Sequence, residues 1–236
     1  MKHSVAVLSL VLFGCATGHQ ARNVIALSDF LGEHRSQMQP GKPGEEPLLV
    51  YRDPHQVQWS QYHEILLEPI SLWIDPNRQM SSDDQRDLQN LVDSFHATLQ
   101  RKLASDYTLV DRDGPGVMRM QIAITDGRRG ATQLKVASIA VPYWIGASLF
   151  WRFATGKPPF VGEASVEYKI TDAGTSELLT AGADRRVGAD TLISRGAVNK
   201  EYLNSWGDVK YILEYWTDDF VYRMCLLRGG AECAKP

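Results

Sequence analysis

Residues 117–125 carry an apolar side chain at every second position, and this period restricts the segment to a β-strand with one covered face. The same period recurs over 160–171, and the turn signal at 172–175 leads into a further strand expected at about 177–187. The covered side chains are Met118, Met120, Ile122 and Ile124 in the first strand and Ala164, Val166, Tyr168 and Ile170 in the second. A sheet of such strands must pack its apolar face against other elements.

Two long segments with helical periodicity supply that second layer. Ser81-Ser82-Asp83-Asp84-Gln85 predicts a helix start, with Ser82 and Gln85 at capping-box spacing, and this helix is expected to end near 104–106. Its apolar stripe is Leu88, Leu91, Val92, Phe95, Leu99 and Leu103. A last helix is expected from Ser205, with Val209, Ile212, Leu213, Trp216, Phe220 and Met224 on its inner face.

Two further strands are expected before residue 117. The first covers 64–74, with Pro69 at an edge or a bulge because proline has no amide donor. The second covers 107–110 and is predicted to form a hairpin with 117–125 around the turn at 111–116. The resulting order β-α-β-β-(apolar insert)-β-β-α predicts an α+β fold, a two-layer sandwich of a mostly antiparallel sheet with two long helices.

The first fourteen residues are typical of an export signal. Lys2 supplies a positive charge, and the apolar stretch at 5–13 is too short for a bilayer core that needs roughly 20 residues. Leu12-Phe13-Gly14-Cys15 resembles the bacterial lipobox, which implies cleavage before Cys15, a diacylglycerol on its thiol and an acyl chain such as palmitate on the new amine. The alternative is a soluble secreted protein in which this cysteine occurs by chance.

Three regions follow from this interpretation: a lipoprotein signal peptide at 1–14, a lipidated tether and docking segment at 15–61, and a single periplasmic α+β domain at 62–236. The tether has many chain breakers and isolated apolar anchors, namely Phe30-Leu31, Leu48-Leu49-Val50-Tyr51 and Trp59. Ala16 stands where an aspartate would mark retention in the inner membrane of enteric-type bacteria, so we expect the outer membrane, on its periplasmic face. A net charge of −3 without a block of like charges argues against nucleic acid as a partner.

The other two cysteines, Cys225 and Cys233, flank a stretch in which Gly229-Gly230 can end a helix and turn the chain back. If Cys15 carries lipid, they form an even pair in an oxidising compartment, and we expect a disulfide. Two free thiols are the main alternative. Redox or metal chemistry lacks support, because the chain has no CxxC motif and no Cys/His cluster.

Sixteen residues without a charge, 136–151, form an apolar insert that is too short and too interrupted by Pro142 to span a membrane. Three interpretations stay open: a buried crossover on the sheet, an exposed surface for a partner protein or the lipid interface, and a pocket for an apolar ligand. The aromatic residues that favour an exposed surface are Tyr143, Trp144, Phe150 and Trp151.

Catalytic motifs are missing from the sequence. It contains no nucleophile elbow, phosphate loop, HExxH or dinucleotide glycine motif, so we expect no catalytic residue, metal or cofactor. His96 is the one histidine on a core helix, where a boundary position is the simpler interpretation than catalysis. Asp184-Arg185-Arg186 is interpreted as a charged cluster at a sheet end, either a structural ion pair or an anion site.

Several short motifs resemble a family of bacterial lipoproteins known only as a domain of unknown function, the one numbered 3313. They are Ser28-Asp29-Phe30-Leu31, Tyr51-Arg52-Asp53-Pro54, Asp111-Arg112-Asp113-Gly114-Pro115-Gly116-Val117 leading into Ile122-Ala123-Ile124-Thr125-Asp126, and Phe160-Val161-Gly162-Glu163-Ala164 leading to Asp184-Arg185-Arg186-Val187-Gly188. The resemblance covers nearly the whole mature chain. It supports an envelope location and implies no activity and no catalytic residues.

The main hypothesis is therefore a non-enzymatic outer-membrane lipoprotein. Cys15 would hold it to the membrane, and its α+β domain would act as an accessory or assembly component of a cell-envelope complex with an unidentified protein partner. A periplasmic carrier or sensor that binds a lipid-like ligand through the apolar insert is the alternative. An enzyme ranks third. The first hypothesis predicts an exposed patch, the second a closed apolar pocket, and the third convergent titratable groups in a cleft.

Overall fold

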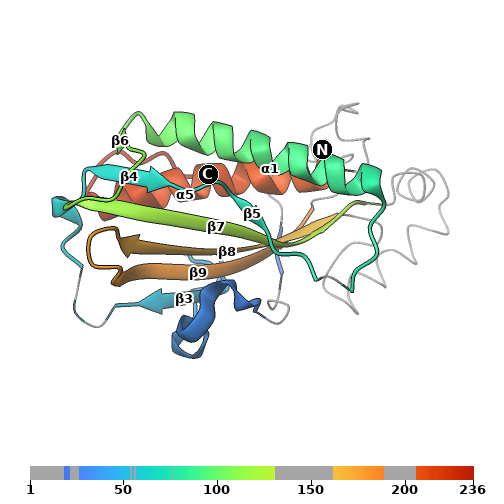
Figure 1. The fold of residues 1–236 in the computed structure, drawn as a ribbon, viewed down its shortest axis with the longest axis horizontal. Helices are drawn as coiled ribbons and strands as arrows, with labels where there is room; N and C mark the ends of the chain where they lie inside the picture. Colours follow the sequence, from blue (N-terminus) through green and yellow to red (C-terminus); the bar gives the residue numbers. More distant parts are fainter. Residues whose placement is uncertain are drawn as a thin grey trace, which may run out of the picture.

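The computed structural model describes residues 19–21, 27–53, 55, 57–75, 77–130, 162–188 and 206–236. In these residues, nine strands form one sheet with the order β2-β3-β9-β8-β7-β4-β6, to which β1 and β5 add at the edges of β9 and β7. Two long helices cover one face of the sheet (Figure 1). The α+β fold with a mostly antiparallel sheet and two long helices is thus confirmed.

Three antiparallel strands form the centre: β7 (Val117–Arg128), β8 (Glu163–Asp172) and β9 (Leu178–Val187). The apolar side chains predicted to be covered in β7 and β8 belong to the core beneath the helices, as the two-residue period predicts. The register between β7 and β8 shifts between Ile124 and Asp126. As a result, Asp126 pairs with Ser165 and both side chains lie on the side of the sheet away from the helices. We call this side, away from the helices, the open face.

The helices α1 (Ser82–Leu103) and α5 (Gly207–Leu227) bury the predicted stripes, except that Leu91 of α1 is only half-buried. The core positions of α1 are Leu88, Val92, Phe95, Leu99 and Leu103, each at most 3% exposed, and burying one such side chain contributes about 1.5–3 kcal/mol. The predicted cap, Ser82, was wrong by one residue. The N-cap is Ser81, whose side-chain oxygen accepts a hydrogen bond from the backbone amide of Asp84. At the start of α5, a Cβ on Gly188 would lie 2.5 Å from that of Asp208, so helix and sheet approach closely here.

The predicted hairpin between 107–110 and 117–125 was wrong. β4 (Glu64–Leu67) lies between β6 (Thr108–Leu109) and β7, and it runs parallel to both. The strand expected over 64–74 is divided into β4 and β5 (Ser71–Leu72), both paired with β7 and separated by the stretch that contains Pro69.

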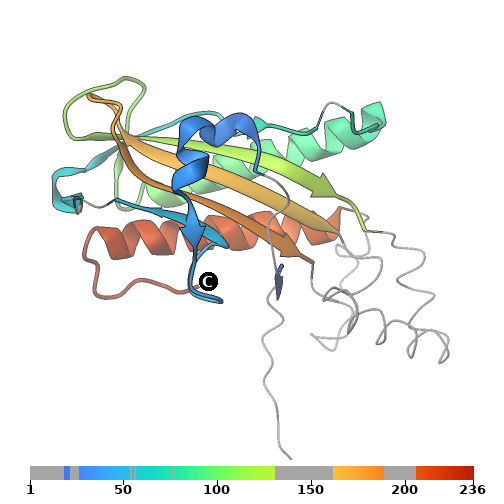
Figure 2. The same cartoon turned by 90° about the horizontal axis from the view of Figure 1, so that it is seen from below.

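The N-terminal segment packs on the open face and on the edge of β9, and its last part, with Trp59, packs against the main core. It contains β1 (His19–Gln20), the 3-10 helix η1 (Asp29–Gln37), β2 (Gln39–Pro40), β3 (Leu49–Arg52) and the short 3-10 helix η2 (Trp59–Gln61). Phe30 and Leu31 of η1 are buried against Ala123, Leu178 and Ala181. Both β1 and β3 pair antiparallel with β9. Figure 2 shows η1 on the sheet face opposite the two long helices.

Candidate functional site

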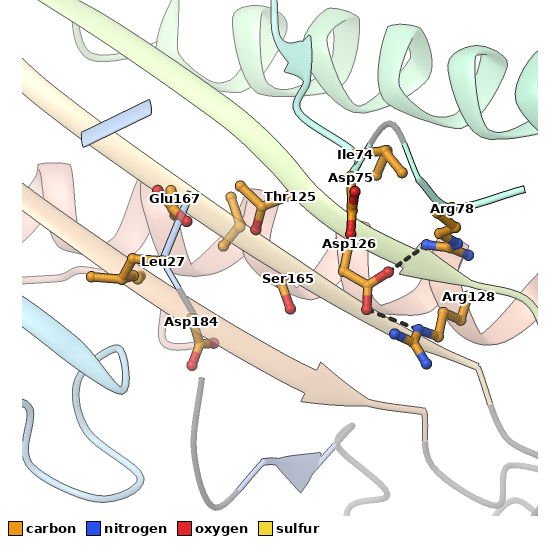
Figure 3. A pocket seen from close by; sticks show the side chains of 12 residues that line it. Leu27, Ile74, Asp75, Arg78, Thr125, Asp126, Arg128, Ser165, Glu167 and Asp184 are labelled. Atoms are coloured by element: carbon orange, nitrogen blue, oxygen red, sulfur yellow. Dashed lines mark hydrogen bonds and ion pairs between the residues drawn. The ribbon is translucent and has the colours of Figure 1, made fainter. Parts of the chain in front are cut away.

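A pocket of about 190 Å³ opens on the open face, between the start of η1 and the segment that follows β5 (Figure 3). Its apolar walls include Leu27, Ile74 and Ala183. Its polar lining includes Arg78, Asp126, Arg128, Ser165 and Glu167. These groups come from β7, β8 and the segment after β5, which lie side by side in the sheet or at its edge.

Asp126 is held by two arginines. It forms ion pairs with the Nη1 atom of Arg78 and with Nε of Arg128, the latter at 3.0 Å, and both appear as dashed lines in Figure 3. Arg78 Nη2 also donates to the carbonyl of Gly127 at 2.6 Å, while the amide of Gly127 donates to Asp126 at 2.9 Å. These bonds lie at the edge of β7, beyond the residues that pair with β5. They satisfy backbone groups that would otherwise be free to pair with another strand.

Glu163 is the next carboxylate along the open face. Arg185 Nη2 donates to its Oε2 atom at 2.6 Å, and Arg128 Nε lies 3.5 Å from its Oε1 atom. Glu163 is buried, and pairing with arginine offsets part of the cost of placing a charge there. Asp126 and Glu163 are therefore both held by arginine in the folded domain.

Glu167 differs from these two carboxylates. It is 2% exposed, and its oxygens accept the backbone amide of Ser28 at 2.7 Å and the Ser28 hydroxyl at 3.0 Å. Among the described residues no lysine, arginine or histidine forms an ion pair with it. Burial is the main influence on this carboxyl and raises the pKa of Glu167 above its ordinary value, against the two bonds from Ser28.

Ser165 stands between these carboxylates on β8. It is 7% exposed, and its Oγ atom is buried without a hydrogen-bond partner in the described structure. Asp126 on β7 and Arg185 on β9 are its cross-strand neighbours. Buried hydroxyl groups are normally satisfied, so an unpaired one that lines a pocket indicates a place for a bound group.

The cluster at 184–186 was predicted as one charged site, and the alternation of the strand divides it between the two faces. Asp184 points to α5, where Trp216 Nε1 donates to Oδ2 at 2.9 Å, and Gln20 Nε2 donates to Oδ1 at 2.9 Å. Arg186 lies 3.8 Å from Asp184 and stacks 3.5 Å above the ring of Tyr215. The structural ion pair is thus present, whereas Arg185 belongs to the open face.

Comparison with family models finds a match to "Protein of unknown function (DUF3313)" over residues 26–220. The chain belongs to the DUF3313 family. A comparison with the curated proteins finds no match.

Several solved structures resemble this DUF3313 protein distantly. They include the PelC dodecamer from Paraburkholderia phytofirmans (9% identity, TM-score 0.30, 68% of this chain and 92% of that chain). Protein XCC0632 from Xanthomonas campestris, of the DUF330 family, is 8% identical with a TM-score of 0.35, over 73% of this chain and 88% of that one. A putative neuraminyllactose-binding hemagglutinin homolog from Helicobacter pylori is 10% identical with a TM-score of 0.29, over 82% and 89%.

The structure places the residues singled out in the sequence as follows. Cys225 and Cys233 are joined by a disulfide with Cα atoms 5.8 Å apart. His96 is half-buried on α1, and its Nδ1 atom has no partner in the described residues. Cys15 and the aromatic residues Tyr143, Trp144, Phe150 and Trp151 lie outside the described residues.

Sequence reasoning missed the pocket of this DUF3313 protein. Its signal was present in the polar positions of β8, because Glu163, Ser165 and Glu167 alternate with the apolar core residues and would ordinarily face water. Within the described ranges no group of three His, Cys, Asp or Glu residues is placed to hold a metal ion. None of the described helices is long and apolar enough to cross a membrane.

Proposed function

We propose that this DUF3313 protein is a non-enzymatic lipoprotein of the outer membrane, anchored through Cys15, whose α+β domain serves in the periplasm as an accessory or assembly component of an envelope complex. The lipobox-like sequence before Cys15 supports the anchor. Asp126 in the pocket and Glu163 beside it are engaged by arginines, and the pocket lining contains no histidine or cysteine among the described residues. These features favour binding over catalysis.

The position of β1 is the observation that carries the proposal. His19 and Gln20 already pair with Val187 and Arg186 of β9, so three residues separate a lipidated Cys15 from the sheet. Four Cα steps span at most about 14 Å. A domain joined to its lipid by so short a linker would lie against the membrane, because the linker is too short to hold the sheet away from the bilayer.

The pairing also supports a particular orientation, in which the end of the domain next to β1 faces the lipid. Arg128, Glu163, Val187 and His19 form one row across the sheet, from β7 through β8 and β9 to β1. The opposite end lies about 30 Å away, because β8 has 10 residues at about 3.3 Å each. Cys225 and Cys233 belong to that far end, where Arg228 after α5 pairs with Asp106 beside β6.

The uncharged stretch 136–151 belongs to a connection that leaves β7 and returns to β8 at the near end. We propose that its aromatic residues Tyr143, Trp144, Phe150 and Trp151 provide the surface for the partner protein or the lipid interface. This assignment rests on the sequence and on the location of the two strand ends.

Membrane fractionation tests the anchor. Wild-type protein is expected in the outer-membrane fraction, with a diacylglycerol and an acyl chain on Cys15 by mass spectrometry, and Cys15→Ser is expected in the soluble periplasm. An unmodified Cys15 on the mature wild-type chain would contradict the anchor.

Orientation is tested separately by a fluorophore on a single introduced cysteine in the reconstituted lipoprotein. Arg129→Cys marks the near end and Glu177→Cys the far end, and both positions are exposed. A quencher attached to lipid headgroups should quench the dye at position 129 strongly and the dye at 177 weakly. Equal quenching would contradict the orientation while leaving the anchor intact.

A further inference from the structure

We propose that the pocket on the open face binds the primary ammonium group of a small ligand, held jointly by Glu167, Ser165 and Asp126. This inference concerns a ligand site and is independent of the lipid anchor. It rests on three oxygen-bearing side chains that line one pocket, and on Glu167 accepting hydrogen bonds from Ser28 without an ion pair to a basic side chain of the described residues.

Glu167 supplies the first argument. Its carboxylate is almost fully buried, and its bonds are those from the amide and hydroxyl of Ser28. A buried carboxylate is costly unless a cation or enough donors compensate it. Each carboxylate oxygen has two acceptor positions, so both oxygens of Glu167 retain capacity for a further donor. A positively charged donor from a ligand would complete the site.

Ser165 supplies an independent second argument. Its side chain lies on the same face of β8 as Glu167, two residues away, and its Oγ atom is buried in the pocket wall without a partner. Asp126 is directly opposite Ser165 across the β7–β8 pair, where Cβ atoms are about 4.5–5.5 Å apart. The three side chains therefore line one wall of the same pocket, with Ser165 between the two carboxylates.

The shape of this acceptor set selects the ligand class. A primary ammonium carries one positive charge and three N–H donors, which matches one hydroxyl and two carboxylates. An anion would meet Glu167 and Asp126, while the arginines beside them are engaged with carboxylates. A metal ion is disfavoured, because the described acidic groups form no cluster suited to one.

The pocket size and its walls restrict the rest of the ligand. A volume of about 190 Å³ holds a short aliphatic amine, and Leu27, Ile74 and Ala183 provide apolar contacts for its carbon atoms. Ala183 is the cross-strand neighbour of Glu167 on β9, and its small side chain leaves room above the carboxylate. Arg128 at the rim is exposed and uses its Nε atom for Asp126 and Glu163, so its Nη atoms are the groups that a phosphate attached to the amine would meet.

Calorimetric titration of the full-length protein in neutral detergent tests the site. The probes are ethanolamine, its uncharged analogue ethylene glycol, and glycerophosphoethanolamine, which carries the same ammonium on a phosphodiester. We expect ethanolamine to bind and ethylene glycol not to bind. Tighter binding of glycerophosphoethanolamine would identify a lipid headgroup as the source, and weaker binding a free amine. Absence of binding by both amines up to about 10 mM would overturn the proposal.

Three variants locate the binding. Ser165→Ala removes a hydroxyl that has no partner in the described fold, so the domain should fold normally while ethanolamine affinity falls about 2- to 10-fold. Glu167→Gln removes the charge and should weaken binding about 10- to 100-fold. Glu177→Gln, at an exposed carboxylate beyond β8, is the matched control and should bind as wild type does. Unchanged affinity in Ser165→Ala would place the amine elsewhere and refute the site.

Discussion

Replacing Trp216 by phenylalanine tests the hydrogen bond that joins α5 to β9. The indole of Trp216 is 2% exposed, and its Nε1 atom donates to Asp184 at 2.9 Å. A hydrogen bond to a charged acceptor contributes about 1.5–3 kcal/mol to stability. The smaller ring leaves unfilled space that costs about 1 kcal/mol more. We therefore expect Trp216→Phe to lower the free energy of unfolding by about 3 kcal/mol.

Urea denaturation followed by circular dichroism measures this loss. With a slope of about 2–3 kcal/mol per molar urea, the midpoint should fall by about 1–1.5 M at an unchanged slope. Trp73→Phe is the matched control, because Trp73 is 43% exposed and its replacement should change stability by no more than about 0.5 kcal/mol.

A double-mutant cycle separates the hydrogen bond from the packing. In the Asp184→Ala background the indole N–H has already lost its acceptor, so Trp216→Phe should cost only about 1 kcal/mol there. The two costs should thus differ by about 2 kcal/mol. If Trp216→Phe costs the same in both backgrounds, the contact with Asp184 contributes nothing and the reasoning is refuted.

Three further predictions concern other parts of the chain. In protein purified without reductant, Cys225 and Cys233 should resist an alkylating agent until a reductant is added, and free labelling of both thiols in the native protein would exclude the disulfide. The double variant Trp144→Ala, Trp151→Ala should keep its denaturation midpoint but lose its co-purifying envelope partner, whereas a loss of about 3–5 kcal/mol for either tryptophan would indicate a buried segment. Because burial raises the pKa of Glu167, the folded state retains this proton to higher pH than the unfolded chain, so ionisation of Glu167 weakens folding as the pH rises above about 4.5. The stability of Glu167→Gln relative to wild type should therefore increase from pH 4 to pH 7, and a decrease over this range would contradict the buried carboxylate.

Local periodicity explains which parts of the fold the sequence could reveal. The stripe of α1 and the alternation in β7 and β8 are long enough to fix both the type of element and its buried face. Strand pairing, in contrast, depends on residues that are far apart in the sequence. The turn at 111–116 favours a hairpin locally, but β4, earlier in the sequence, lies between its two arms in the sheet. The pattern of β6 and β7 alone contains no trace of that insertion.

The candidate pocket required the three-dimensional structure for a similar reason. Glu167 and Ser165 are two residues apart and their common face was predictable, but Ser28 comes from a segment expected to be a tether. The register shift before Asp126 decides that this side chain joins them on the open face. A bulge of one residue has no clear mark in a sequence whose neighbouring positions are both polar. The disulfide was different, because the even pair left beside Cys15 and the glycine pair between the two cysteines favoured it over free thiols from the sequence.

The pairing of β1 and β3 with β9 has a consequence for how the chain folds. Gln20 and Asp184 are 164 positions apart in the sequence, yet they share a hydrogen bond. During synthesis the N-terminal end emerges first, and its strands find no partner until β9 has followed. Such distant contacts are slow to form, since a long loop must close before any pairing offsets its entropy. The N-terminal strands should therefore be the last to acquire protection from hydrogen exchange during refolding, and the edge of β9 stays open to other chains until they arrive.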